Sequence, residues 1–211
     1  INYPSEFLKI KKYLNDPKII IVLRDPINRA YSNYLHLKRE QRETLSFNEA
    51  IDAEEERIKN KYSDFWYYKF NSTYFEKVVK AKEVFSDVLI LTIEQLNKNP
   101  EKTIKQVCQF LKVDDSFKIE QISRKFNLGG NYKINLITKI LFQPSWFKNR
   151  IKRVIKPTPF IKIILMKLSS FFISKPETID DETLTYLTKH FKEDVEKLKN
   201  ISVDTSNWRE Y

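Results

Sequence analysis

The stretch that decides the fold is Lys18-Ile-Ile-Ile-Val-Leu-Arg24-Asp25-Pro26-Ile-Asn-Arg-Ala-Tyr-Ser32-Asn-Tyr34. It opens with an unalternating run of β-branched and aliphatic residues, which is typical of a strand buried on both faces of a parallel sheet. Asp25 is a good helix N-cap and Pro26 fits a first helical turn. The stretch therefore predicts a strand, a tight turn and the N-terminus of a helix.

The chain on both sides of this stretch alternates helix and strand signals. Ser46-Phe-Asn-Glu49, for example, is a capping box that starts a helix. The expected elements are helices over residues 27–39 and 47–60, a helix opened by Ser72, a strand over residues 88–93, and helices starting near Asn99 and Asp180. Helices alternating with apolar strands predict an α/β fold, in which a parallel sheet is flanked by helices.

Arg24 and Ser32 are candidate ligands for a phosphate group. Arg24 follows a buried strand, and open α/β sheets bind ligands at that edge. Ser32 lies one turn beyond Asn28, on a helix face that can look back at Arg24. Free backbone N–H groups at the helix N-terminus favour an anion, a guanidinium grips phosphate through two N–H bonds, and a hydroxyl adds a third donor. The alternatives are a strand-end arginine in a surface ion pair and an ordinary helix serine.

The segment Arg24-Asp-Pro-Ile-Asn-Arg-Ala-Tyr-Ser32-Asn-Tyr34 closely resembles the 3'-phosphate-binding motif of the sulfotransferases that use 3'-phosphoadenosine-5'-phosphosulfate (PAPS). In that family the arginine and the serine hold the 3'-phosphate of the donor, and the resemblance implies these roles for Arg24 and Ser32. Residues 43–50 are similar to the segment after this motif in bacterial carbohydrate-type members. Residues 88–113 are similar to the family's next strand–helix unit, and residues 184–208 to the closing helix and terminal tryptophan of bacterial members.

The resemblance implies a fold similar to that of P-loop NTPases. It also implies transfer of a sulfuryl group from PAPS to a hydroxyl or amine, with adenosine 3',5'-bisphosphate as the second product. A carbohydrate is the expected acceptor.

The family's loop for the 5'-phosphosulfate is missing from the chain. Only two glycines are present, Gly129 and Gly130, so no glycine-rich nucleotide loop exists. Residues 1–23 are similar to the stretch just before the 3'-phosphate motif. We therefore expect the chain to start inside the domain, with the general base upstream of Ile1 and no catalytic residue assigned. We also expect residues 1–211 alone to be inactive.

Three further residues are candidate donor contacts by resemblance. The family often places an aromatic residue for adenine in the region of Tyr74, whose alternative role is core packing with Val78. Gly130 and Lys133 fall where family members have a loop touching the donor phosphates, and an ordinary turn is an equal alternative. His36 and His190 are expected to be solvated or packing side chains rather than catalytic bases.

The formal net charge of +10 comes from one segment. Residues 121–176 carry 12 Lys or Arg and no Asp or Glu, whereas the other 155 residues carry 26 basic and 28 acidic side chains. Two basic amphipathic helices are expected there, over residues 137–156 and 160–174. Their roles stay open between a solvated cationic face, an anionic acceptor site and contact with an anionic membrane surface. The alternative function is therefore a non-enzymatic module that binds membrane or polyanion. No nucleic-acid motif accompanies the charge.

Length and composition set the remaining expectations. A chain of 211 residues predicts one partial domain, with an α/β part (1–120), the basic segment (121–176) and a closing helix with a tail (177–211). One cysteine excludes an intramolecular disulfide, and with two histidines no metal is expected. The expected setting is a microbial cytoplasm, with a membrane surface as an option and the Golgi lumen for a eukaryotic source.

Overall fold

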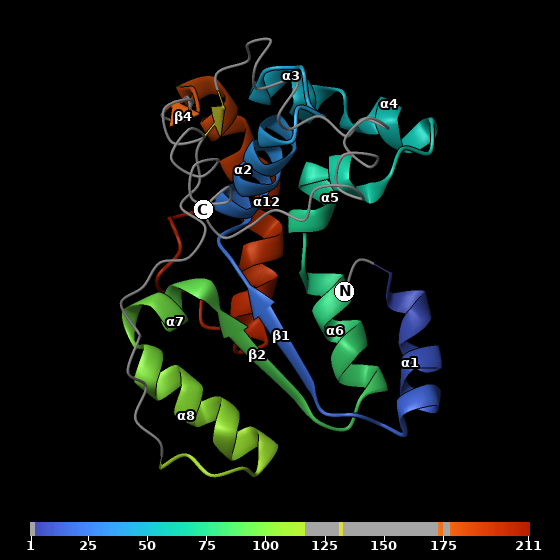
Figure 1. Ribbon diagram of the computed structural model, residues 1–211, viewed down its shortest axis with the longest axis vertical. Coiled ribbons are helices and arrows are strands. Elements are labelled where there is room, and N and C mark those ends of the chain that lie inside the picture. The colour runs from blue at the N-terminus through green and yellow to red at the C-terminus, as the bar shows by residue number, and fades with distance from the viewer. Residues whose placement is uncertain (1–2, 117–130, 133–172, 175–177) are drawn as a thin grey trace, which may run out of the picture.

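The computed structural model describes residues 3–116, 131–132, 173–174 and 178–211 (Figure 1). Two central strands, β1 (Ile19–Leu23) and β2 (Val88–Thr92), pair in parallel, with Ile19 opposite Val88 and Leu23 opposite Thr92. Five α-helices connect them, because parallel strands require a crossover. This helix-rich α/β arrangement confirms the predicted fold class.

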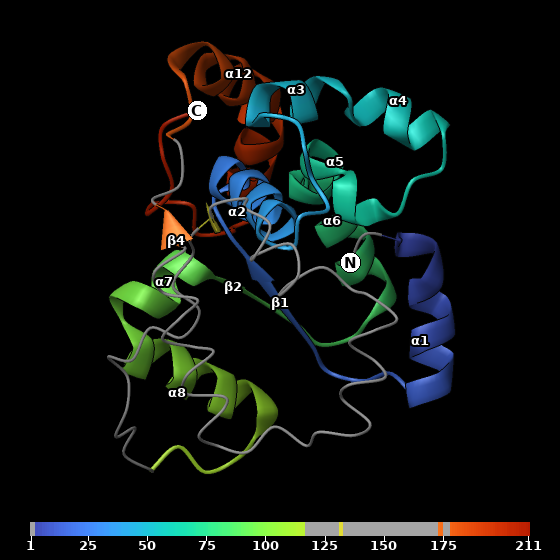
Figure 2. The ribbon, with the colours of Figure 1, turned by 45° about the horizontal axis from the view of Figure 1, so that its top comes forward.

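Helices surround the strand pair. They are η1 (Pro4–Glu6), α1 (Phe7–Leu14), α2 (Pro26–Arg39), α3 (Phe47–Asp52), α4 (Glu54–Lys59), η2 (Asp64–Trp66), α5 (Tyr68–Ser72), α6 (Phe75–Val84), α7 (Ile93–Lys98), α8 (Pro100–Leu111) and α12 (Asp181–Asn200). Helices α1 and α6 lie on one side of the strands and α7 and α8 on the other (Figures 1 and 2). Helices α2, α3 and α5 gather beyond the carboxyl ends of the strands (Figure 1), and α12 packs against both α2 and α6.

The core lies where α2, α5, α6 and α12 meet. Its largest fully buried apolar side chains are Ile27, Leu37, Ile51, Tyr68, Val78, Leu187, Phe191, Val195 and Leu198. The buried residues of α2 recur at helical spacing and form one stripe, as do those of α12. Helix α2 is therefore anchored along its length, and its opposite face is left for other contacts.

Strand β1 is covered less completely than its sequence predicts. Ile21 and Leu23 are buried, but Val22 between them is 51% exposed. Successive side chains of a strand point to opposite faces, so the described residues cover the face of Ile21 and leave the face of Val22 open at this end. The described residues therefore do not bury both faces of this part of the strand, contrary to the prediction.

The capping box at Ser46 is present, but the helix that it starts is shorter than predicted. The Glu49 carboxylate accepts the Ser46 N–H at 2.8 Å. The helix then breaks at Ala53, which separates α3 from α4. Helix α12 starts as predicted, because Asp180 accepts the Thr183 N–H at 2.8 Å.

Helix α6 begins later than predicted and has a distant cap. Ser72 ends α5 instead of opening the next helix, and α6 starts at Phe75. The Asp194 carboxylate, on α12, accepts N–H bonds from Tyr74 and Phe75, both at 2.9 Å. The cap thus comes from the far end of the chain, which explains why local sequence misplaces this helix.

Most of the basic segment lies outside the described residues, including the helix predicted over residues 137–156. Ile173–Ser174 form a strand, β4, which pairs antiparallel with β3 (Asn131–Tyr132). The helix predicted over residues 160–174 is therefore wrong at its end. Strand β3 lies beside α2. In the part of the chain that the structure describes, no helix has the length and apolar character needed to cross a bilayer.

Candidate functional site

Arg24 lies at the carboxyl edge of the parallel strands. It follows Leu23, the last residue of β1, which pairs with Thr92 at the end of β2. The side chain is half-buried, and its guanidinium makes no hydrogen bond or ion pair with any residue that the structure describes. A half-buried cation without a protein partner at this edge is suited to bind an anionic ligand.

Ser32 lies on α2, opposite the stripe that anchors the helix. It follows Asn28 by one turn, roughly 6 Å along the helix axis. The residue is half-buried, and its hydroxyl has no hydrogen-bond partner among the described residues. Arg24 and Ser32 therefore both present unused donors, one just before α2 and one on its second turn.

The N-terminus of α2 is not free to bind an anion, contrary to the prediction from sequence. The Asp25 carboxylate accepts the Asn28 N–H at 2.8 Å, and the Tyr211 hydroxyl accepts the Ile27 N–H at 3.4 Å. Asp25 is only 1% exposed, and its carboxylate is the N-cap of α2 that the sequence predicts. The N–H groups of Ile27 and Asn28 are therefore already bound to protein acceptors, whereas the side-chain donors of Arg24 and Ser32 have no partner among the described residues.

Tyr74 supports the backbone of Arg24. Its hydroxyl donates to the Arg24 carbonyl at 3.0 Å, and its ring packs against Trp208 with 6.3 Å between the ring centroids. The residue is 4% exposed, and this burial raises the pKa of its hydroxyl. Adenine stacking needs an exposed ring face, so the geometry supports core packing, the alternative role of Tyr74.

The C-terminal residues close over the turn that follows β1. Trp208 Nε1 donates to the Glu94 carboxylate at 2.9 Å, and the other oxygen of Glu94 accepts the Asp25 N–H at 3.2 Å. Arg209 Nε forms an ion pair with the Asp25 carboxylate at 3.0 Å. These contacts of the C-terminal residues were not predicted from the sequence. The sequence feature that indicated them was the resemblance of the terminal tryptophan to that of bacterial relatives.

Comparison with known proteins identifies the architecture. A model described as "Sulfotransferase domain" matches residues 3–133, more than half of the chain. The chain belongs to the sulfotransferase family. It is similar to the crystal structure of a sulfotransferase from Alicyclobacillus acidocaldarius, with 26% sequence identity and a TM-score of 0.68. The match covers 98% of this chain and 63% of that one. None of the curated proteins searched matches the chain.

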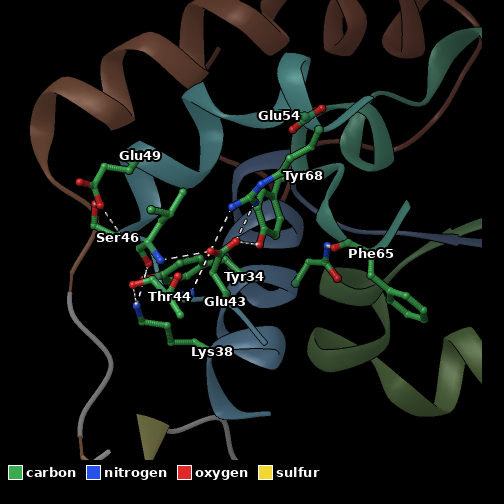
Figure 3. A network of polar contacts seen from close by, with 12 residues as sticks. Tyr34, Lys38, Glu43, Thr44, Ser46, Glu49, Glu54, Phe65 and Tyr68 are labelled. Atoms are coloured by element: carbon green, nitrogen blue, oxygen red, sulfur yellow. Dashed lines mark hydrogen bonds and ion pairs between the residues drawn. The ribbon is translucent and has the colours of Figure 1, made fainter. Parts of the chain in front are cut away.

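A buried ion pair fixes the segment that follows α2 (Figure 3). Arg57 binds both carboxylate oxygens of Glu43, at 2.7 and 3.1 Å, and the Tyr68 hydroxyl donates to Glu43 at 2.6 Å. The N–H groups of Thr44 and Leu45 complete the shell, at 3.0 and 3.1 Å. Burial alone would raise the pKa of Glu43, but these donors outweigh it and hold that pKa below its ordinary value.

A pocket of about 370 Å³ opens beside this ion pair. Its wall includes Tyr62 and Trp66, whose rings meet edge to face, and the Arg42 guanidinium lies 4.7 Å from the Trp66 ring centroid. The same segment is tied to α2, because Asn33 Nδ2 donates to the Phe65 carbonyl at 2.8 Å. The pocket therefore lies in a segment joined to α2 at the residue next to Ser32.

Two predicted donor contacts, Gly130 and Lys133, and the two histidines remain to be located. Gly130 and Lys133 lie outside the described residues, on either side of β3. His36 interacts with Arg39 and Glu40 at the end of α2. His190 packs between Tyr186 and Phe191, and burial lowers its pKa. In the described part of the chain, no group of His, Cys, Asp or Glu is arranged to hold a metal ion.

Proposed function

We propose that this chain carries the 3'-phosphate site of a PAPS-dependent sulfotransferase, and that Arg24 and Ser32 bind that phosphate. The observation that carries the proposal is the unpaired Arg24 guanidinium at the carboxyl edge of the strands. Membership of the sulfotransferase family supports it, because these enzymes need a sulfuryl donor. The chain spans 63% of the length of the similar bacterial protein, so the activity of the whole protein is part of the proposal.

The reaction is the transfer of a sulfuryl group to a hydroxyl or amine of an acceptor. The acceptor oxygen or nitrogen forms a bond to sulfur while the bond from sulfur to the donor's phosphate oxygen breaks, which leaves adenosine 3',5'-bisphosphate. A general base takes the acceptor's proton. Arg24 and Ser32 make or break no bond, but they fix the donor so that its sulfur lies in line with the acceptor.

The general base is not among the residues at the turn. Asp25 is buried and bound to Arg209, and Glu94 is bound to Asp25 and Trp208. Neither of the two histidines lies there. We therefore assign the residues at the turn to donor binding and name no general base among them.

The acceptor that we propose is a carbohydrate. The pocket beside Trp66 supports this, because its lining combines aromatic rings with planar polar side chains. That lining is Arg42, Glu43, Thr44, Leu45, Ala53, Glu56, Arg57, Asn60, Tyr62 and Trp66. Small-molecule sites use apolar faces for contact area and a few polar groups for orientation, and a sugar offers both kinds of surface.

Titration of two nucleotides tests the donor site. Adenosine 3',5'-bisphosphate and adenosine 5'-monophosphate differ only in the 3'-phosphate, so the ratio of their affinities reports the contacts to that group. A hydrogen bond to a charged group is worth about 1.5–3 kcal/mol, so Arg24→Ala should lower this ratio tenfold or more, and Ser32→Ala should lower it too. Arg39→Ala, at the far end of α2, is the control and should leave the ratio unchanged. An unchanged affinity ratio in both site variants would refute the assignment of Arg24 and Ser32 to the 3'-phosphate site.

A further inference from the structure

We propose that the C-terminal clasp, residues 208–211, is part of the donor site, with Arg209 as its positioning residue. The clasp is 184 residues from the turn in sequence, yet it contacts the residues that follow Arg24. The inference rests on the proposed function, since it assigns Arg209 a role in the same 3'-phosphate site.

Arg209 binds the turn through three separate groups. Its Nε donates to both oxygens of Asp25, at 3.0 and 3.2 Å, and its backbone N–H donates to Asp25 at 3.2 Å. Its Nη2 donates to Asn28 Oδ1 at 2.8 Å. Asn28 and Ser32 share one face of α2, so the Arg209 guanidinium lies on the side of the helix that carries the proposed phosphate ligand.

The other residues of the clasp hold the same turn from its two ends. Trp208 fixes the Glu94 carboxylate, which accepts the Asp25 N–H, and the Tyr211 hydroxyl accepts the Ile27 N–H. Trp208 also packs against Tyr74, which donates to the Arg24 carbonyl. The Arg24 carbonyl and the Asp25 N–H, on either side of one peptide bond, are therefore each bound by a side chain that Trp208 contacts.

The positive charge of Arg209 also compensates the negative charge of the buried Asp25 carboxylate. The Asp25 carboxylate is 1% exposed, so little water screens it, and it lies close to where a phosphate must bind. Arg209, whose side chain is 28% exposed, neutralises this charge. Without it, the uncompensated carboxylate next to Arg24 would repel the phosphate, and a repulsion of about 1.4 kcal/mol lowers affinity tenfold. Arg209 thus makes a buried carboxylate compatible with an anionic ligand.

A charge-rescue experiment separates this role from simple stabilisation. Arg209→Gln removes the charge, and the double variant Asp25→Asn with Arg209→Gln removes both charges while asparagine still caps α2. The readout is the affinity ratio of adenosine 3',5'-bisphosphate to adenosine 5'-monophosphate, which a general loss of stability moves little. We expect a roughly tenfold lower ratio for Arg209→Gln and near wild-type values for the double variant. Lys98→Gln, which removes an exposed contact to neighbouring Asn207, is the control.

Each outcome decides one claim. An unchanged ratio in folded Arg209→Gln would overturn the inference, and so would a lowered ratio that the double variant does not restore. If Arg209→Gln does not fold, Arg209→Lys and the double variant are measured against wild type instead. A double variant with an affinity ratio tenfold below that of wild type would then overturn the inference. A wild-type chain that does not distinguish the two nucleotides would refute the proposed function itself, before any variant is compared.

Discussion

Replacing Arg57 with methionine tests the buried ion pair that fixes the segment after α2. Glu43 is 2% exposed and the Arg57 side chain 10%, and two of the five donors to Glu43 belong to Arg57. The substitution leaves a buried carboxylate with only Tyr68 and two backbone N–H groups. Removing one partner of a buried ion pair costs about 3–5 kcal/mol, because the remaining charge stays desolvated.

Urea unfolding at pH 7 measures this cost. With an unfolding slope of about 2–3 kcal/mol per molar urea, the midpoint should fall by roughly 1–2 M. Lys80→Met is the control, because Lys80 and its partner Glu83 are exposed, with side chains 47% and 56% accessible, and such a surface pair contributes about 0–1 kcal/mol. The control midpoint should therefore move little.

The pH dependence of the loss gives the refuting result. The folded pKa of Glu43 is lowered, so the ion pair contributes fully above the ordinary glutamate pKa and loses its contribution as pH falls through the folded value. In Arg57→Met, fewer donors oppose the effect of burial on the pKa of Glu43, so Glu43 is protonated at a higher pH than in wild type. Protonation removes the buried charge and so reduces the loss of stability at low pH. The difference from wild type should shrink between pH 7 and pH 4. A loss below about 1 kcal/mol at pH 7, or one that is independent of pH, would refute the reasoning.

Three further substitutions test other buried groups. Burial lowers the pKa of Lys77 to about 8, so wild-type stability in urea unfolding should rise between pH 8 and 10, whereas that of Lys77→Met should not. The Ser72 hydroxyl is buried without a partner among the described residues, so Ser72→Ala should raise stability by about 1 kcal/mol in the same assay, and a loss of that size would contradict this. Tyr74→Phe removes the bond to the Arg24 carbonyl and should cost about 1–3 kcal/mol and weaken binding of adenosine 3',5'-bisphosphate severalfold; full affinity would show that Arg24 needs no such support.

The local part of the fold and site could be predicted because its signals are contiguous. The apolar run before Arg24 and the cap at Asp25 lie within a few residues of each other, and the structure contains the strand, turn and helix that they predict. The parallel pairing of β1 with β2 follows from the same pattern of apolar strands joined by helices.

The rest could not be predicted because it depends on contacts between distant residues. The cap of α6 comes from Asp194, 120 residues beyond Tyr74, so Ser72 was a misleading local signal. The Ile27 N–H, expected to be free at the N-terminus of α2, is bound by the hydroxyl of Tyr211, 184 residues away. Spacing within one segment carries no information on such partners.

A crystal structure with adenosine 3',5'-bisphosphate tests the central claim most directly. The account predicts that oxygens of the 3'-phosphate lie about 2.7–3.2 Å from the Arg24 guanidinium and from Ser32 Oγ, with Asp25 still bound to Arg209. A 3'-phosphate bound instead to lysines or arginines of residues 121–176, with Arg24 and Ser32 free, would contradict the account.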